Sequence, residues 1–250
     1  MEILGIDIGG SGVKGAMVDT EAGAFIGDRL RIDTPQPATP DAVIDVVGQI
    51  VSHFDYSGPL GVGFPAIVLD GVTMSAANVD NGWIGYPGRD KIAAMTGCDV
   101  TMLNDADVAA IAEMRFGAGR GRDGMVMVFT LGTGIGSAMF INGHLVPNTE
   151  LGHVYMPNQP PGQDAEDLAA SSVRKAEGLS WSEWGDRLNA YFQHMERLFS
   201  PNLMIIGGGV SKKHEKFLHH IDVRAEVVPA QLRNQAGIVG AALAAIGIGT

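Results

Sequence analysis

A glycine-rich turn between two apolar runs occurs twice in the sequence, and this repeat limits the folds that the chain can adopt. The first copy occupies residues 4–18, with its turn near residue 10. The second copy follows the apolar run 125–129, where residues 132–139 repeat the pattern of residues 10–17. Apolar runs that flank a short glycine turn are typical of a β-hairpin. The repeat therefore favours a duplicated chain with one such hairpin in each of two lobes.

Turns of this composition suit phosphate binding. Glycines let the backbone turn sharply, so that several N–H groups can point at one anion. Asp7 stands where the first apolar run ends, and its carboxylate could hold a divalent cation against phosphate oxygens. An ordinary structural turn explains a single copy equally well. Two copies that face each other across a cleft could bind the two ends of one phosphate donor.

Composition and charge exclude several classes of protein. The chain has 250 residues, enough for one large or two small domains, and 46% of them are hydrophobic. No apolar run is long enough to span a membrane, and the N-terminus lacks the pattern of a signal peptide, so we expect a cytoplasmic protein without a membrane partner. The single cysteine, Cys98, allows neither an internal disulfide nor a cysteine zinc site. A formal charge of -11 argues against nucleic-acid partners, and a polyanionic ligand would need cations concentrated locally.

The remaining pattern predicts mixed sheets with flanking helices. Residues 24–32 alternate as a third antiparallel strand would, and the prolines that follow end this strand. Thr39 is expected to cap a helix that starts with Pro40, and a short buried strand follows at residues 60–65. This is an α/β layout. Residues 181–199 predict an amphipathic helix. Its apolar stripe suits either core packing or a dimer face, and it comprises Trp184, Leu188, Tyr191, Phe192, Met195 and Leu198.

Asn104 and Asp105 follow a predicted strand at residues 100–103 and begin a predicted helix. Both residue types are preferred N-caps, and either could simply accept helix N–H bonds. Ligands of open α/β sheets collect where strands end and helices begin. A carboxylate there could accept a proton from a hydroxyl whose oxygen attacks phosphorus. Both interpretations of Asp105 stay open at this point.

Three further segments allow both a structural and a binding interpretation. Residues 74–87 carry amides, carboxylates and Trp83, which suit either a surface loop or a sugar-binding loop whose indole covers a sugar ring. Glu150 and His153 are poor evidence for a metal pair and suit hydrogen bonds to a polyol better. The strand 203–206 leads into a glycine turn and a helix start, an arrangement that can bind a phosphate or a nucleotide.

These features occur in the order that is found in a known family. They are the two hairpins, Asn-Asp at 104–105, Glu-Leu-Gly-His at 150–153 and the triple glycine at 207–209. On these residues the chain resembles the actin-like sugar kinases of the ROK group, and within that group the bacterial polyphosphate glucokinases. The resemblance covers essentially the whole chain.

The resemblance implies an α/β fold of the actin-like ATPase, ribonuclease H-like type, which is duplicated and has mixed sheets with flanking helices. One lobe would comprise residues 1–106 with the C-terminal helix 236–250, and the other residues 107–235, with a cleft between them. A homodimer is implied as well. Many family members carry a cysteine-rich zinc motif after the Glu-Leu-Gly-His segment, whereas residues 154–162 contain no cysteine. We therefore expect no zinc, and the polyphosphate-using branch also lacks that motif.

The resemblance further implies phosphorylation of glucose at its 6-hydroxyl, with polyphosphate or also ATP as donor, Asp105 as general base and Mg²⁺ near Asp7. Glucose would be bound by Asn78, Asn104, Asp105, Glu150, His153 and Glu166. The donor would be bound by Asp7, Gly9, Gly10, Ser11, Gly12, Lys14, Gly132, Thr133, Gly134, Gly208, Gly209 and Lys212. A positive track for a long polyphosphate would comprise Lys14, Arg120, Arg122, Lys212, Lys213, Lys216 and Arg233.

Other functions compete with this one. An ATP-dependent glucokinase, or a kinase for mannose or another hexose, could use the same loops. Sugar-sensing repressors among the relatives need a helix-turn-helix before the sugar domain, and the first predicted strand begins at Glu2. A non-catalytic sugar-binding protein would not require both Asp7 and Asp105.

Overall fold

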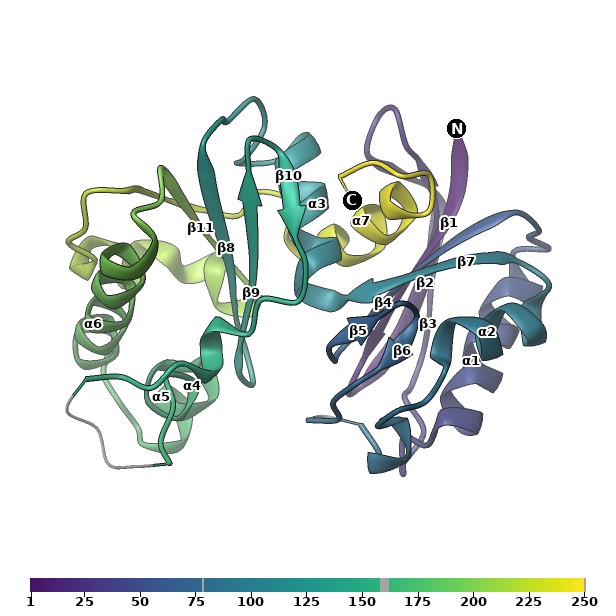
Figure 1. Ribbon diagram of the computed structural model, residues 1–250, viewed down its shortest axis with the longest axis horizontal. Helices are drawn as coiled ribbons and strands as arrows, with labels where there is room; N and C mark the ends of the chain where they lie inside the picture. The colour runs from purple at the N-terminus through teal and green to yellow at the C-terminus, as the bar shows by residue number, and fades with distance from the viewer. Residues whose placement is uncertain (78, 158–161, 250) are drawn as a thin grey trace. The chain divides into compact units, whose positions relative to one another are not determined.

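The computed structural model describes residues 1–77, 79–157 and 162–249, and the chain forms two compact units (Figure 1). Unit 1 comprises Met1–Ala112 and Gln235–Thr250, and unit 2 comprises Glu113–Asn234. The division falls inside helix α3 (Asp105–Phe116), whereas the lobe boundary expected from the sequence lies between residues 106 and 107.

Unit 1 is built on a five-stranded mixed sheet in the order β3-β2-β1-β4-β7. Its strands are β1 (Glu2–Gly9), β2 (Gly12–Asp19), β3 (Ala24–Ile32), β4 (Pro59–Phe64) and β7 (Asp99–Asn104). The first three are antiparallel neighbours, while β4 runs parallel to β1 and β7 runs parallel to β4. The carboxyl ends of β1, β4 and β7 therefore lie at one edge of the sheet.

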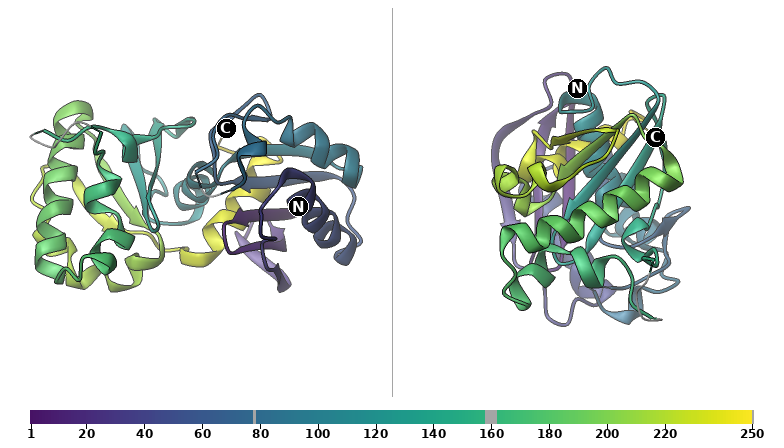
Figure 2. Two further views of the ribbon diagram at one scale, coloured as in Figure 1. Left: turned by 90° about the horizontal axis from the view of Figure 1, so that it is seen from below. Right: turned by 90° about the vertical axis from the view of Figure 1, so that its left-hand side faces the viewer.

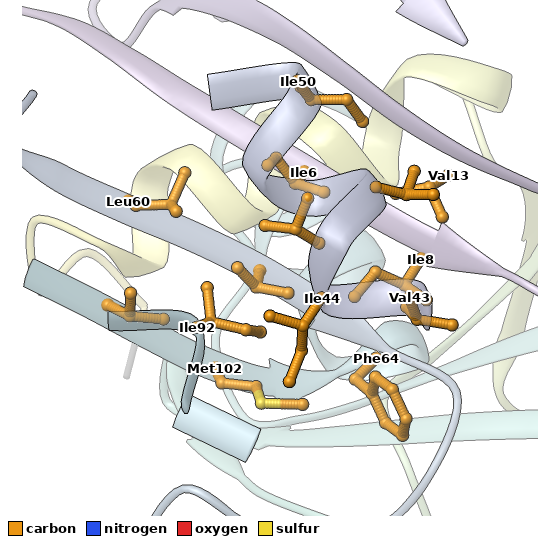
Figure 3. Close-up of a cluster of buried hydrophobic side chains, with 14 of the residues drawn as sticks. Ile6, Ile8, Val13, Val43, Ile44, Ile50, Leu60, Phe64, Ile92 and Met102 are labelled. Atoms are coloured by element: carbon orange, nitrogen blue, oxygen red, sulfur yellow. The ribbon is translucent and has the colours of Figure 1, made fainter. Parts of the chain in front are cut away.

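Helices cover both sides of this sheet. They are α1 (Pro40–His53), α2 (Gly88–Thr96), α3 and the C-terminal α7 (Ala236–Ala244), which contacts β1 and β4. Figure 3 shows aliphatic side chains of the sheet, among them Ile6 and Ile8, facing Val43 and Ile44 of α1. Burial of each such side chain contributes about 1.5–3 kcal/mol. The apolar pattern therefore fixes which face of each element is buried.

The ends of two helices in unit 1 follow from their terminal residues. Gly97 ends α2 in the left-handed conformation, with φ of 71°. Thr39 is the N-cap residue of α1 and Pro40 follows at the helix start, as predicted, but the Thr39 side chain makes no capping hydrogen bond. A small sheet of β5 (Val68–Leu69) and β6 (Val72–Thr73) and the turn η1 (Asn81–Trp83) complete the unit.

Unit 2 repeats the strand arrangement of unit 1. Its sheet has the order β10-β9-β8-β11-β12. The strands are β8 (Met125–Leu131), β9 (Ile135–Ile141), β10 (His144–Val146), β11 (Leu203–Gly207) and β12 (Glu226–Pro229). Again the first three are antiparallel, and β11 and β12 continue the sheet in parallel. The duplication expected from the repeated turn is thus present in the topology.

The long helix α6 (Trp181–Phe199) crosses one face of the unit 2 sheet (Figure 2). A capping box of Ser180 and Glu183 starts it. Five members of the predicted apolar stripe are buried, and the sixth, Leu198, is 54% exposed. The shorter helices are η2 (Leu151–His153), α4 (Glu166–Ala169), α5 (Ser171–Ala176), η3 (Gly209–Lys216), η4 (Leu218–His220) and η5 (Arg233–Gln235). Within the described ranges, no helix is both long and apolar enough to cross a membrane.

Candidate active site

The first glycine turn lies at residues 10–11, between the paired ends of β1 and β2. Three side chains hold its carbonyl oxygens. The Oγ1 of Thr34 donates to the carbonyl of Gly9 at 2.5 Å, the Nη2 of Arg31 donates to that of Ser11 at 2.8 Å, and the Nε2 of Gln36 donates to that of Gly10 at 3.4 Å. These bonds fix the orientation of the peptide units in the turn.

Asp7 and Lys14 are opposite each other on β1 and β2, and the lysine Nζ lies 3.0 Å from the Oδ2 of Asp7. The carboxylate also borders the first turn of α7, because a Cβ on Gly237 would lie 3.1 Å from the Cγ of Asp7. A helix start favours a negative charge beside it. One partly exposed carboxylate next to a phosphate-type turn fits the way Mg²⁺ is held, by one or two carboxylates together with phosphate oxygens.

Asn104 ends β7 and caps α3. Its Oδ1 accepts hydrogen bonds from the backbone N–H groups of Ala106 and Asp107, at 2.8 and 3.3 Å, and its Nδ2 donates to the carbonyl of Ala66 at 3.1 Å. The side chain is only 7% exposed. The capping interpretation of Asn104 is therefore confirmed, and only the second N–H of its amide remains for a sugar.

Asp105 is the first residue of α3 and lies at the same sheet edge as Asp7. The register aligns Asp7 with Gly63 on β4, and Gly63 with Leu103 on β7. Asp105 comes two residues after Leu103 and is partly buried. β1 and β7 are separated by two strand spacings, about 10 Å, and both carboxylates therefore lie at the same edge of the unit 1 sheet. Ligands of parallel sheets bind beyond this edge.

The second glycine turn joins β8 to β9 at residues 132–134. The N–H of Gly132 donates to the carbonyl of Gly134 at 3.0 Å, which closes the turn. Ser172 of α5 holds it from outside, because its N–H donates to the carbonyl of Gly132 at 3.0 Å and its hydroxyl donates to that of Thr133 at 2.5 Å. As in the first hairpin, a neighbouring segment fixes the orientation of the turn.

The Glu-Leu-Gly-His segment is attached to the second hairpin and to α6. The N–H of Leu151 donates to the Oγ of Ser137 at 2.9 Å, and the hydroxyl of Tyr191 donates to the Leu151 carbonyl at 3.1 Å. Burial raises the pKa of Tyr191, so this hydroxyl stays a donor. Gly152 lies so close to β9 that a Cβ would be 2.3 Å from the carbonyl oxygen of Ile135. The local sequence therefore positions Glu150 and His153 next to the glycine turn.

His153 is surrounded by three carboxylates, which together form the polar cluster of unit 2. Its Nδ1 lies 2.8 Å from the Oδ2 of Asp164 and 3.9 Å from the Oε1 of Glu166, and its Nε2 lies 3.9 Å from the Oε2 of Glu150. The hydrogen bond with Asp164 raises the pKa of His153, while burial raises the pKa of Glu150. Such a set of donors and acceptors suits the hydroxyls of a sugar.

Three members of this cluster also satisfy the geometry of a metal site. His153, Asp164 and Glu166 offer ligand atoms that all lie within 4.8 Å of one another. Each of the two carboxylates already accepts a hydrogen bond, Asp164 from His153 and Glu166 from the N–H of Ile135 at 3.0 Å. Sequence reasoning missed Asp164, although it stands two residues before Glu166 in the same acidic run.

The triple glycine at 207–209 lies against the second hairpin. Gly208 has φ of 80°, and a Cβ on it would be 2.4 Å from the carbonyl oxygen of Leu131, the last residue of β8. The helix that follows is the 3₁₀ helix η3. A cavity of about 530 Å³ opens beside Ser211 and His214 of η3, and its wall includes Arg122, Glu226 and Gln231. A cavity of this size fits a small-molecule ligand.

The sequence model of the ROK family matches residues 3–166. The chain belongs to the ROK family. It is 48% identical over 244 residues to a polyphosphate glucokinase of Mycobacterium tuberculosis, covering 97% of this chain and 91% of the relative. Among solved structures, it is similar to the inorganic polyphosphate/ATP-glucomannokinase of Arthrobacter sp. strain KM, with 47% identity, a TM-score of 0.91 and 98% of each chain covered. The ROK glucokinase of Streptomyces griseus in complex with glucose and AMPPNP is 27% identical, with a TM-score of 0.81, 97% of this chain and 98% of that chain covered.

The expectations of family and fold for this ROK chain are confirmed, and the structure decides one interpretation that the sequence leaves open. Trp83 is fully buried and donates its Nε1–H to the carbonyl of Ala38 at 3.0 Å, so its indole is not available to cover a sugar. Lys14 and Arg122, which the sequence suggests for a positive track, each form an ion pair, with Asp7 and Glu226. Asn78 lies outside the described residues.

Proposed function

We propose that this ROK chain transfers a phosphoryl group from inorganic polyphosphate to the 6-hydroxyl of glucose, and that ATP serves as a second donor. One observation carries the proposal. In unit 2, Glu166 of the polar cluster accepts the N–H of Ile135, and a Cβ on Gly134 would lie 2.3 Å from its Oε2. Hydroxyl-binding groups and a phosphate-type turn are therefore adjacent, as transfer of a phosphoryl group to a sugar requires.

On the acceptor side, Asp105 would orient and deprotonate the 6-hydroxyl. A carboxylate in this role accepts the proton as the oxygen attacks phosphorus. The position of Asp105 at the start of α3, beyond the carboxyl end of β7, supports the assignment. The remaining hydroxyls would be bound by Asn78, Asn104, Glu150, His153 and Glu166.

On the donor side, the backbone N–H groups of both glycine turns would bind phosphate oxygens, and the triple glycine would bind the more distant part of the donor. Phosphoryl transfer in kinases generally uses a divalent metal, and we propose Mg²⁺ held by Asp7. The cation would neutralise charge on the donor phosphates. Lys14, 3.0 Å from Asp7, would add a second positive charge beside the same turn.

The relatives support this choice of substrates. The Mycobacterium tuberculosis relative is a polyphosphate glucokinase, and the Arthrobacter relative uses polyphosphate or ATP and is a glucomannokinase. The latter makes phosphorylation of mannose a second candidate activity. We also propose a homodimer, which light scattering of the purified chain would test.

A coupled assay tests the proposed reaction. Production of sugar 6-phosphate is measured with glucose or mannose as acceptor and with polyphosphate or ATP as donor, with and without Mg²⁺. We expect turnover with glucose and polyphosphate that is lost without the metal. Absence of turnover with every combination of donor and acceptor would refute a hexokinase-type activity.

Replacement of Asp105 tests the general base. Asp105→Asn should retain glucose binding and lower kcat by roughly a hundredfold or more, because the amide cannot accept the proton. Asp90→Asn is the matched control, since Asp90 is an exposed carboxylate in the first turn of α2. Turnover of Asp105→Asn close to that of the control would exclude this role for Asp105.

A further inference from the structure

Three cationic side chains of unit 2 gather around the indole of Trp181. The Cζ of Arg174 lies 4.0 Å from the ring centroid, the Nζ of Lys216 lies 5.6 Å from it and the Nζ of Lys213 lies 5.9 Å from it. Arg174 comes from α5, and both lysines come from η3. The three residues and Trp181 are called the cation cluster below.

The cations of this cluster have no acidic partner within 4.0 Å in the described part of the chain. Arg174 donates from its Nη1 to the carbonyl of Leu179 at 3.1 Å, and its buried Nε has no hydrogen-bond partner among the described residues. Acidic residues outnumber basic ones in the sequence, 28 to 17. Three positive charges without an acidic partner, each within 5.9 Å of one ring centroid, raise the local positive potential, which favours binding of an anion.

The indole explains how these cations can stay together and remain able to bind an anion. A cation over an aromatic face is attracted by the ring quadrupole. Unlike a carboxylate, the ring carries no net charge and therefore does not cancel the field that an anion experiences. The lysines are exposed, so their ammonium groups are accessible from solvent.

The cation cluster is connected to the donor side of the candidate active site by η3. This helix begins at Gly209, directly after Gly208, which lies against the end of β8. At roughly 2 Å per residue of a 3₁₀ helix, the kink at Lys213 follows about 8 Å further on, and Lys216 lies beyond it. A chain of phosphates that starts at the second glycine turn could therefore extend to the cluster, whereas three phosphates that end in a nucleoside supply no further anionic groups.

We infer that Arg174, Lys213 and Lys216 around Trp181 form a binding site for the distal phosphates of a long polyphosphate chain. The inference rests on the proposed function for the identity of the polyanion. Nucleic acid suits the cluster less well, because Arg174 at 4.0 Å covers an indole face that a base would need for stacking. The site shares Lys213 and Lys216 with the expected track and adds Arg174.

Direct binding without glucose tests the inference. Affinities for long polyphosphate and for tripolyphosphate are measured by calorimetry at two salt concentrations. The double variant Lys213→Ala, Lys216→Ala should bind long polyphosphate roughly tenfold more weakly and tripolyphosphate less than twofold more weakly. The affinity for long polyphosphate should also depend less on the salt concentration. Both lysines are exposed, so the fold should persist. Arg174→Gln provides an independent variant with the same expected preference.

The matched control removes two exposed cations from unit 1 by Arg29→Ala with Lys91→Ala, so that net charge changes equally. An equal loss in this control, or an unchanged long-chain affinity in the Lys213 and Lys216 variant, would overturn the site. Single-stranded nucleic acid that binds as tightly as long polyphosphate would also overturn it. A failure to phosphorylate glucose would refute the proposed function and leave this binding result intact.

Discussion

At the scale of single residues, the charge of His153 is set by the carboxylates around it. The hydrogen bond with Asp164 at 2.8 Å, assisted by Glu166 and Glu150, raises the pKa of His153 in the folded chain. Folding therefore favours the protonated imidazole. The resulting stabilisation is complete below the unfolded pKa of about 6.5 and is lost as the pH rises through the folded pKa.

Asp164→Asn should lower the pKa of His153, which an NMR titration of the imidazole would measure. The stability difference between the unmodified chain and this variant, from urea unfolding, should be larger at pH 6 than at pH 9. Asp167→Asn is the control, because Asp167 is exposed and its Oδ2 accepts only a 3.3 Å bond from the backbone of Asp164. If the pKa of His153 were the same in both variants, the pairing with Asp164 would be wrong.

The sequence predicted hydrogen bonds of the candidate site where the partners are neighbours along the chain. It did not predict hydrogen bonds between segments that are distant in sequence. Asn104 follows from N-cap preference, because its bonds go to residues 106 and 107. Nothing near Glu113 indicates that this buried carboxylate accepts the N–H groups of Gln231 and Leu232, at 3.1 and 2.7 Å. Trp83 was ambiguous for the same reason, since its partner Ala38 is remote in sequence.

At the scale of elements, two glycines of the second hairpin border its two proposed functions. Gly134 lies beside the carboxylate proposed to bind glucose, and Gly132 lies where a donor phosphate would approach. A Cβ on Gly134 would lie 2.3 Å from the Oε2 of Glu166, whereas a Cβ on Gly132 would meet nothing within 4 Å. Neither glycine has a positive φ, so alanine is compatible with both backbones. Crowding at position 134 therefore acts on Glu166, the carboxylate proposed to bind the sugar, while a methyl at position 132 acts only on a ligand that approaches the turn.

Gly134→Ala should displace the Glu166 carboxylate, raise the KM for glucose and cost about 1 kcal/mol through the lost bond to the N–H of Ile135. Gly132→Ala should leave stability unchanged and raise the KM for polyphosphate, because the methyl blocks close approach of a phosphate. Steady-state kinetics and urea unfolding of the two variants check both statements. Identical kinetic effects would show that the turn does not separate donor from acceptor.

The duplication of the chain was predictable from the repeated glycine turn, and the structure extends this repeat to the whole sheet. Alternation and helical periodicity gave β1 to β3, α1 and α6 in their observed places. The length and type of short helices were not predictable. The glycine turn at 207–209 predicts a helix start, for example, but not that η3 is a 3₁₀ helix with a kink at Lys213. Leu198 fits the helical stripe of α6 but lies in its last turn, where the periodicity does not show how far the covering core extends.

At the scale of the whole molecule, the two ends of the chain build one unit. Helix α7 follows unit 2 in sequence, yet it packs on β1 and β4 of unit 1. Glycines make this approach possible, because a Cβ on Gly5 would lie 2.1 Å from the carbonyl oxygen of Ile238 and one on Gly61 would lie 1.8 Å from that of Ala241. These obstacles are backbone atoms, which cannot turn aside as a side chain does.

Gly61→Ala should therefore separate α7 from β4 and lower the free energy of unfolding by roughly 3 kcal/mol. Gly48→Ala is the matched control in α1, where the new Cβ would meet only the flexible Met95 side chain at 3.3 Å and helix propensity would improve by about 1 kcal/mol. Urea unfolding gives both free energies, and amide hydrogen exchange in β1 and β4 should be faster for Gly61→Ala alone.

Because Asp7 lies on β1 beside Gly237, Gly61→Ala should also weaken Mg²⁺-dependent turnover. Equal stability of the two variants would mean that α7 does not close unit 1.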